Sequence, residues 1–190
     1  MAVQTERTMT VAEYLEWEER QEIRHEFIDG EIIEMSGGSG KHSKIAMNIA
    51  LALGSLVNLL NFVFHSSNMR IRIREHRYVY PDLCIVGHDE IYEDESELTL
   101  LNPVFVVEVT SSSSAMRDRV DKLGYYGEVP SIKGYLIVDQ DRPRADLYTR
   151  SQEGWHLQIF NNAEAVIPLP MLDCELSLAQ VYRGIEIAEA

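Results

Sequence analysis

The 190-residue sequence predicts a single α/β domain in which helices flank a set of central strands. Three observations point to this class. Apolar runs within residues 78–86, 103–109 and 134–139 have the composition of buried strands. Apolar residues at helical spacing occur before and between these runs. No internal repeat, low-complexity tract or linker divides the chain, so we expect one domain over residues 1–190.

The N-terminal part of the chain carries two local signals. Thr10 and Glu13 have the spacing of a capping box, which predicts a short helix that ends near Gln21. Asp29 and Gly30 lie between apolar residues, and an Asp-Gly pair in that setting is a strong signal for a tight β-hairpin. We therefore expect a helix followed by two short antiparallel strands.

The middle and C-terminal parts alternate between helical and strand patterns. Residues 41–60 predict a long helix with one buried stripe, and strict alternation over 69–74 predicts a strand with an apolar face and an arginine face. The buried stripe consists of Ile45, Ile49, Leu53, Leu56 and Leu60. The remaining expected elements are strands over 78–86, 103–109 and 134–139, a helix over 115–126, an antiparallel pair over 145–148 and 155–160, and a small helix over 176–182.

Charge and composition restrict the class of protein. The formal net charge is −14, whereas proteins that hold nucleic acid by its phosphates usually carry an excess of lysine and arginine. An acidic metal pocket and a local basic strip can still share one surface. The two cysteines, Cys84 and Cys174, match no metal-ligand spacing and favour a reducing, cytoplasmic compartment. No stretch resembles a signal peptide or a membrane span, so we expect no membrane partner.

Two acidic residues lie in or beside apolar strand segments. Asp82 follows Pro81 at the start of one strand, and Glu108 lies in the apolar run 106–109. A carboxylate that loses its water must be paired, protonated or bound to a metal. Two carboxylates at neighbouring strand ends could bind one Mg²⁺ or Mn²⁺ ion, with waters and phosphate oxygens completing its shell. Either acid alone could instead be structural, Asp82 in a turn and Glu108 in an ion pair.

Lys122 follows these acids on the predicted helix. Beside metal-bound carboxylates, a lysine can orient or deprotonate an attacking water, or stabilise the charge of a phosphoryl transition state. The same residue could form an i,i+4 pair with Asp118 on an exposed helix face, which contributes only about 0.2–0.5 kcal/mol. Together with Asp82 and Glu108, Lys122 favours a divalent-metal nuclease.

The only concentrated basic strip consists of Arg70, Arg72 and Arg74 on one strand face, with Arg77 beyond. Guanidinium groups bind phosphates in a bidentate manner, so the strip could contact a nucleic acid backbone. It could equally be a solvated edge strand whose charges prevent aggregation. The net charge of −14 favours the second interpretation.

Taken together, these segments resemble the Uma-two family of putative restriction endonucleases, within the PD-(D/E)XK nuclease superfamily. The resemblance covers about residues 8–160 and rests on order and spacing. It implies a restriction-endonuclease-like fold, namely a mixed central sheet flanked by helices, with an N-terminal hairpin and added antiparallel strands. The matching segments are 10–15, 25–32, His42, Pro81-Asp82, 106–109, Asp118 with Lys122 and Tyr125, and 134–139.

The resemblance also implies site residues. Asp82 and Glu108 would bind the metal, Lys122 would be the catalytic lysine, and Glu26 would be an additional acid. In the wider superfamily the lysine stands two residues after the second acid, where this chain has Thr110. The role would then have moved to Lys122 on the following helix.

His42, at the start of the long helix, belongs to the same implied set. Its imidazole could contact a phosphate or a metal-bound water. On the residues alone, His42 is more often a surface or capping residue, and Glu26 is at least as often an exposed residue at the start of a strand. Neither would be singled out without the resemblance.

Three functions remain open from the sequence. The first is a Mg²⁺-dependent endonuclease that hydrolyses phosphodiester bonds in DNA. The second is a non-catalytic binding or oligomeric scaffold that keeps a nuclease-like fold. The third is a metal phosphoesterase acting on a small substrate, which would ease the conflict with the net charge of −14. Edge strands over residues 145–160 could also pair across a two-fold axis, giving a homodimer.

Overall fold

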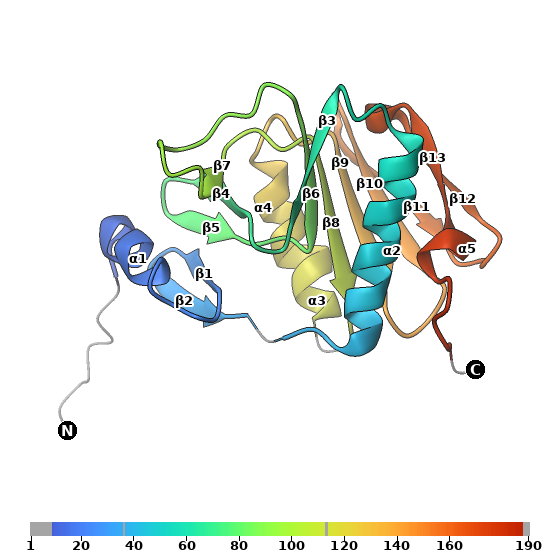
Figure 1. Ribbon diagram of the computed structural model, residues 1–190, viewed down its shortest axis with the longest axis horizontal. Helices are drawn as coiled ribbons and strands as arrows, with labels where there is room; N and C mark the ends of the chain where they lie inside the picture. The colour runs from blue at the N-terminus through green and yellow to red at the C-terminus, as the bar shows by residue number, and fades with distance from the viewer. Residues whose placement is uncertain (1–8, 36, 113, 188–190) are drawn as a thin grey trace.

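The structure is a computed structural model that describes residues 9–35, 37–112 and 114–187. Its largest sheet has six strands in the order β11-β10-β9-β8-β6-β3 (Figure 1). β8 and β9 are parallel, and the other neighbours are antiparallel. This mixed sheet confirms the predicted fold class. The strands are β3 (Phe62–Ser66), β6 (Leu83–Gly87), β8 (Phe105–Thr110), β9 (Gly134–Asp139), β10 (Ala145–Ser151) and β11 (Gly154–Phe160).

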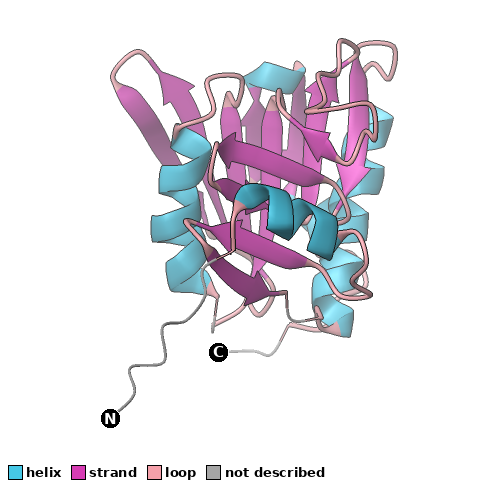
Figure 2. Ribbon diagram, turned by 90° about the vertical axis from the view of Figure 1, so that its left-hand side faces the viewer, coloured by secondary structure: helices cyan, strands magenta, loops and turns pink. Residues whose placement is uncertain are grey.

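Helices cover both faces of this sheet (Figure 2). On one face α2 (Gly40–Leu56) buries Ile45, Ile49 and Leu53 against alternate residues of β6, β8 and β9. On the other face a continuous helical segment is made by α3 (Ala115–Arg117), the π-helical turn η1 (Asp118–Lys122) and α4 (Leu123–Gly127). All six residues of β8 are buried, and successive side chains of a strand point to opposite faces. Phe105, Val107 and Val109 therefore contact the α2 side, while Glu108 points to the α3–α4 side.

A second, five-stranded sheet has the order β2-β1-β5-β4-β7 and lies beside α1 (Val11–Glu18). The ring of Tyr14 from α1 stacks on Phe27 at 4.7 Å between ring centroids, and Tyr78 completes this small core. This cluster fixes the N-terminal segment against the sheet that carries Glu26. The strands are β1 (His25–Ile28), β2 (Glu31–Glu34), β4 (Arg70–Arg74), β5 (Arg77–Val79) and β7 (Thr99–Leu100).

The C-terminal part closes the α2 face of the large sheet. β12 (Val166–Leu169) and β13 (Cys174–Ser177) form an antiparallel pair joined by the 3-10 turn η2 (Pro170–Leu172). α5 (Leu178–Val181) follows directly, and its buried residues Leu178 and Val181 join the same core as Ile45 and Ile49. No helix within the described residues is long and apolar enough to span a membrane.

Several local predictions are confirmed. Both hydrogen bonds of the Thr10–Glu13 capping box are present. Asp29 and Gly30 form the tight turn between β1 and β2, with φ of 53° and 101°. The predicted strands over 69–74, 103–109 and 134–139 and the 145–160 hairpin appear within a few residues of their expected bounds.

Other predictions were wrong in extent. The first helix ends at Glu18 instead of near Gln21, and α2 ends at Leu56, which leaves Leu56 and Leu60 exposed. The single strand expected over 78–86 is divided between β5 and β6, which belong to different sheets. Pro81 lies at the division, since proline has no N–H to donate to a strand ladder. The helix expected over 176–182 is shortened because β13 extends to Ser177.

Candidate active site

Asp82 lies directly before β6 and is held at the end of β8. Its Oδ2 accepts a hydrogen bond of 2.7 Å from the backbone N–H of Val109. Its Oδ1 lies 2.8 Å from Nε2 of His42, near the start of α2. The N-terminal turn of α2 is capped by the Ser39 hydroxyl, which accepts from the His42 N–H at 3.1 Å. Asp82 is thus positioned next to Glu108 by contacts from two other elements.

Glu108 points from β8 into a buried cluster under the helical segment. Its Oε1 accepts hydrogen bonds of 2.7 Å from Lys122 Nζ and 2.7 Å from the Tyr126 hydroxyl. Lys122 and Tyr126 are four residues apart, so they lie on one face of the helical segment. The predicted exposed pairing of Lys122 with Asp118 is wrong, because Lys122 is only 5% exposed and bonds to Glu108.

The π-helical turn η1 explains why this lysine turns inward. A π-helical turn inserts a residue into a helix and often occurs at functional sites. Both ends of the turn, Asp118 and Lys122, are buried. Lys122 Nζ also lies 3.2 Å from Oε1 of Glu26.

Glu26 enters the cluster from β1. It is 1% exposed, so the interpretation as an exposed residue at the start of a strand is wrong. Its Oε1 accepts from the Tyr80 backbone N–H at 3.3 Å, and its Oε2 pairs with Arg117. Lys122 therefore bridges Glu26 of one sheet and Glu108 of the other.

All five residues predicted for the site line one cavity of about 900 Å³. Figure 1 shows its setting, where β8 points between α3 and the start of α2. Among its described lining residues, five are acids and three are lysine or arginine. The acids are Glu26, Glu34, Asp82, Glu108 and Asp118, and the cations are Arg24, Arg117 and Lys122.

This excess of negative charge changes the titration of the buried groups. Burial raises the pKa of Glu108 to about 8; Lys122 opposes the rise, and Asp82 and Asp118 add to it. Burial alone would lower the pKa of Lys122, but the carboxylates of Glu108, Glu26 and Asp118 raise it overall, so the ammonium form persists. The hydrogen bond to Asp82 raises the pKa of His42.

The donor set fits a hard divalent cation. Within the described residues, no three His, Cys, Asp or Glu side chains form a group that could hold a metal alone. Asp82 and Glu108 nevertheless supply two carboxylates in a site where negative charge is in excess. Mg²⁺ is usually bound by one or two carboxylates, with waters and substrate phosphates as the other ligands. Two carboxylates facing an open cavity match that requirement.

Thr110 and Lys122, the two candidates for the position of the superfamily lysine, have different surroundings. Thr110 lies two residues after Glu108 on the same face of β8, and it is buried with its hydroxyl 3.1 Å from that of Ser114. Lys122 Nζ reaches the carboxylate of Glu108 from the helix instead. The geometry is consistent with a lysine that has moved from the strand to the helix.

The arginine strip belongs to structural ion pairs. Arg70 is 4% exposed, donates to Thr99 at 2.8 Å and lies over the rings of Tyr14 and Tyr78. Arg72 pairs with Glu93, Arg74 with Glu128, and Arg77 with Asp29. The interpretation of the strip as a phosphate contact is therefore not supported by its surroundings.

Sequence reasoning missed three residues near the site: Tyr126, Arg117 and Arg24. Tyr126 could have been found, since it stands four residues after Lys122 on a predicted helix. No local sequence pattern marks Arg117 or Arg24 as a site residue. They reach the site only because β1 and α3, which are far apart in sequence, pack together in the fold.

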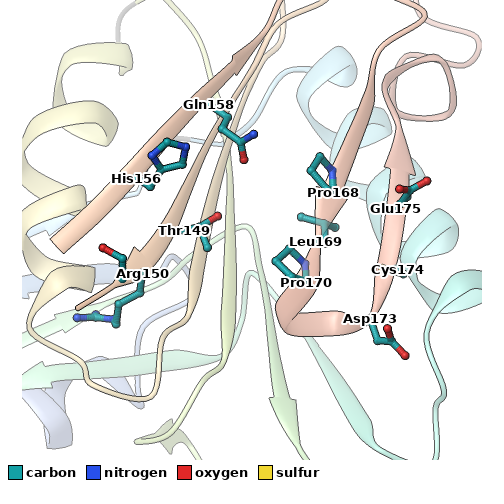
Figure 3. A pocket seen from close by; sticks show the side chains of 11 residues that line it. Thr149, Arg150, His156, Gln158, Pro168, Leu169, Pro170, Asp173, Cys174 and Glu175 are labelled. Atoms are coloured by element: carbon teal, nitrogen blue, oxygen red, sulfur yellow. The ribbon is translucent and has the colours of Figure 1, made fainter. Parts of the chain in front are cut away.

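A second cavity, of about 440 Å³, lies between the β10–β11 hairpin and the β12–β13 pair. Figure 3 shows His156 and Gln158 on one side and Pro168, Leu169 and Pro170 on the other. The Arg150 guanidinium at its rim donates to backbone carbonyls, among them Ile132 at 2.6 Å. This cavity lacks the converging buried charges of the first.

Comparisons with known proteins identify the family of this chain. Residues 11–180 match the Uma2 family, described as "Putative restriction endonuclease". An uncharacterized protein of Synechocystis sp., sll1609, is 34% identical over 151 residues, covering 79% of this chain and 85% of the relative. A second one, slr1290, is 30% identical over 174 residues, covering 91% and 90%.

A solved structure shows the same fold. It is described as a putative nuclease belonging to DUF820 from Anabaena variabilis, and it superposes with a TM-score of 0.76 at 19% identity. The match covers 92% of this chain and 97% of that one. Because the family model matches residues 11–180, the chain belongs to the Uma2 family of putative restriction endonucleases.

Proposed function

We propose that the protein is a divalent-metal-dependent endonuclease that hydrolyses phosphodiester bonds in DNA. One observation carries this proposal: Lys122 Nζ lies 2.7 Å from Glu108, at the end of β8 where the backbone of Val109 holds Asp82. Two carboxylates and a lysine thus meet in one cavity, although they come from separate segments of the chain. This combination is suited to in-line attack of water on a phosphodiester.

Each residue has a definable task. Asp82 and Glu108 would hold Mg²⁺ or Mn²⁺, which supplies activation of water and neutralises charge on the phosphoryl oxygens. The neighbouring carboxylates raise the pKa of Lys122, so its ammonium group would stabilise the negative charge on the phosphoryl oxygens of the transition state. His42 keeps Asp82 oriented through the 2.8 Å contact at Oδ1. Glu26 holds Lys122 in place from the opposite sheet.

The test is cleavage of supercoiled plasmid in Mg²⁺ or Mn²⁺ by wild type, Asp82→Asn and Glu108→Gln. We expect nicking by wild type and at least a hundredfold loss in each variant, because removing a metal ligand costs several kcal/mol in the transition state. Glu153→Gln, an exposed substitution in the turn after β10, is the matched control and should cleave like wild type.

Metal titration separates the alternatives. Metal binding by wild type without nicking would redirect the proposal to a phosphoesterase on a small substrate. Neither binding nor nicking would favour the scaffold. Variants that nick as well as wild type would show that Asp82 and Glu108 do not carry the activity. Circular dichroism of each variant excludes unfolding as the cause of lost activity.

We also propose that two copies associate through β11. This strand lies at the edge of the six-stranded sheet, and Leu157 and Ile159 on it are exposed. An antiparallel edge strand can pair with its own copy across a two-fold axis. Light scattering should give twice the chain mass for wild type and the mass of one chain for Gln158→Pro, since proline on the edge interrupts such pairing.

A further inference from the structure

We propose that Arg24 binds a second phosphate of the substrate, next to the one that is cleaved. This inference rests on the proposed nuclease function and narrows its substrate class. The site would bind a polynucleotide more tightly than a small phosphodiester. Its basis is the position of one unpaired guanidinium on the wall of the cavity that holds Asp82 and Glu108.

Arg24 differs from the other cations near the site in having no carboxylate partner. Within the described residues, no acid lies at ion-pair distance from it, and its recorded side-chain contact is with the ring of Tyr80, 5.9 Å from Cζ to the ring centroid. In contrast, Lys122 is bonded to Glu108 and Glu26, and Arg117 is paired with Glu26. Among the described lysine and arginine residues that line the cavity, Arg24 is therefore the one whose charge no carboxylate contact neutralises.

The support under Arg24 is rigid. Tyr80 is 2% exposed, and its hydroxyl donates to Glu18 at 3.1 Å. Glu18 is itself buried and accepts from the backbone N–H of His25 at 2.9 Å. The backbone of Arg24 is fixed as well, because its carbonyl accepts from the Met35 N–H at 2.9 Å. A guanidinium held over a fixed ring loses less conformational freedom on binding a phosphate.

The order of contacts along the wall places Arg24 away from the cleaved phosphate. Lys122 contacts both Glu108 and Glu26, Glu26 accepts from the Tyr80 N–H, and Arg24 lies over the Tyr80 ring. Two residues, Glu26 and Tyr80, thus link Arg24 to Lys122, whereas no ion pair or hydrogen bond within the described residues joins Arg24 to Lys122 or Glu108 directly. We therefore assign a phosphate on Arg24 to the position beside the phosphate that Lys122 would contact.

The opposite wall has another character. It is formed by α2, which contributes the apolar side chains of Ala46, Met47 and Ala50, and Met47 is 59% exposed. A strand with phosphates along one edge and bases along the other matches a cavity that offers the free guanidinium of Arg24 on one side and apolar side chains of α2 on the other. A single-phosphate diester would reach Lys122 but not Arg24.

The test compares Arg24→Gln with wild type on two substrates: a DNA oligonucleotide and bis(p-nitrophenyl) phosphate, which has one phosphate. The control is Arg20→Gln, an exposed arginine on the turn after α1 that pairs with Glu16. We expect Arg24→Gln to raise KM for the oligonucleotide about tenfold, with little change in kcat. Hydrolysis of bis(p-nitrophenyl) phosphate should match wild type.

Binding of a fluorescein-labelled oligonucleotide in Ca²⁺ gives a readout that does not depend on cleavage. The slope of log affinity against log salt should fall by about one in Arg24→Gln and be unchanged in Arg20→Gln. An unchanged slope with unchanged KM overturns the inference, and so does an equal loss on both substrates. If wild type cleaves neither substrate while Arg24→Gln still lowers the slope, the nuclease proposal fails and the phosphate contact stands.

Discussion

Charge gathers in two regions of this molecule, and the fold handles it differently in each. On β4 and β5 all four arginines meet partners from neighbouring segments: Arg72, Arg74 and Arg77 pair with carboxylates, and Arg70 donates to a hydroxyl and lies over two tyrosine rings. In the cavity at the end of β8 the acids outnumber the lysine and arginine residues, and the excess lies among the most buried groups. The arginine partners are Thr99 for Arg70, Glu93 for Arg72, Glu128 for Arg74 and Asp29 for Arg77.

Comparing the two regions shows which pattern of charge indicates a ligand-binding site. A run of like charges on a strand is conspicuous in sequence, but neighbouring segments can neutralise it. A buried excess of one sign is inconspicuous in sequence, yet it is expensive in the fold because desolvated carboxylates need cations. Burial raises the pKa of Glu108, which expresses that cost.

The largest expected effect comes from removing the one buried cation of the cavity. Lys122→Met leaves Glu108 and Glu26 without their shared partner, which should lower the free energy of unfolding by about 3–5 kcal/mol. Urea unfolding with and without Mg²⁺ measures this, and added metal should restore part of the loss because it binds the folded state. Lys44→Met, at an exposed position of α2, is the control. Equal unfolding midpoints for the two variants would mean that the cavity is not short of positive charge.

Next in size is the loss of a hydroxyl that donates to Glu108. Tyr126→Phe removes the 2.7 Å bond, and hydrogen bonds to charged groups contribute about 1.5–3 kcal/mol, so kcat/KM should fall at least about tenfold. Tyr182→Phe is the matched control, since its hydroxyl bonds to the backbone carbonyls of Asp139, Arg142 and Arg144, none of which lines the cavity. A similar drop in activity for both variants would attribute the effect to general loosening of the fold.

The sequence predicted the acids of the site better than their neighbours. Asp82 and Glu108 stood out because a carboxylate in an apolar strand violates the usual pattern of burial, and the structure brings both to the end of β8. Lys122 was ambiguous, since an i,i+4 pair with Asp118 fits an ordinary helix. The π-helical turn that buries both residues depends on tertiary packing and has no local signature.

The surroundings of Glu26 and of the arginine strip were also not predictable from local sequence. Glu26 looked exposed because β1 is short and flanked by charges, but the pairing of β1 with β5 brings it under Tyr80. The arginines of residues 70–77 looked available because their partners lie 15 or more residues away in sequence at Glu93, Thr99 and Glu128. Local strands and turns were predictable from spacing, whereas long-range charge pairing was not.

The arginine strip should contribute little to the binding of nucleic acid, because its side chains are engaged by other residues of the fold. The double variant Arg72→Gln/Arg74→Gln should bind a labelled oligonucleotide within twofold of wild type. Its free energy of unfolding should fall by about 1 kcal/mol, because Glu93 and Glu128 each lose one partner at a partly exposed site, while Tyr78 still donates to Glu93 and Arg77 still pairs with Glu128. A fivefold or greater loss of affinity would show that both charged regions contact the substrate. Pairing within the fold would then not distinguish a structural charge from a binding one.

The smallest effect is expected at the edge of the strip, where Asp29 pairs with Arg77. The hydrogen bond from Arg77 lowers the pKa of Asp29 below its usual value. A carboxyl whose pKa is lower in the folded state stabilises the fold above its unfolded pKa of about 3.9, and this contribution is lost as pH falls through the folded pKa. The Asp29 side chain is 55% exposed, so solvent screening should limit the gain to about 0.5 kcal/mol at neutral pH.

Asp29→Asn isolates that charge, since asparagine is favoured at the positive φ of 53° that this turn requires. Urea unfolding between pH 2 and pH 7 should show wild type slightly more stable at neutral pH, with the difference vanishing in acid and in about 1 M salt. A difference that persists in acid would mean that the substitution acts on the turn conformation. A difference several times larger at neutral pH would mean that the ion pairs of the strip contribute as much to stability as the buried charges of the cavity. Exposed, paired charges would then be as good an indicator of a ligand site as buried, unpaired ones.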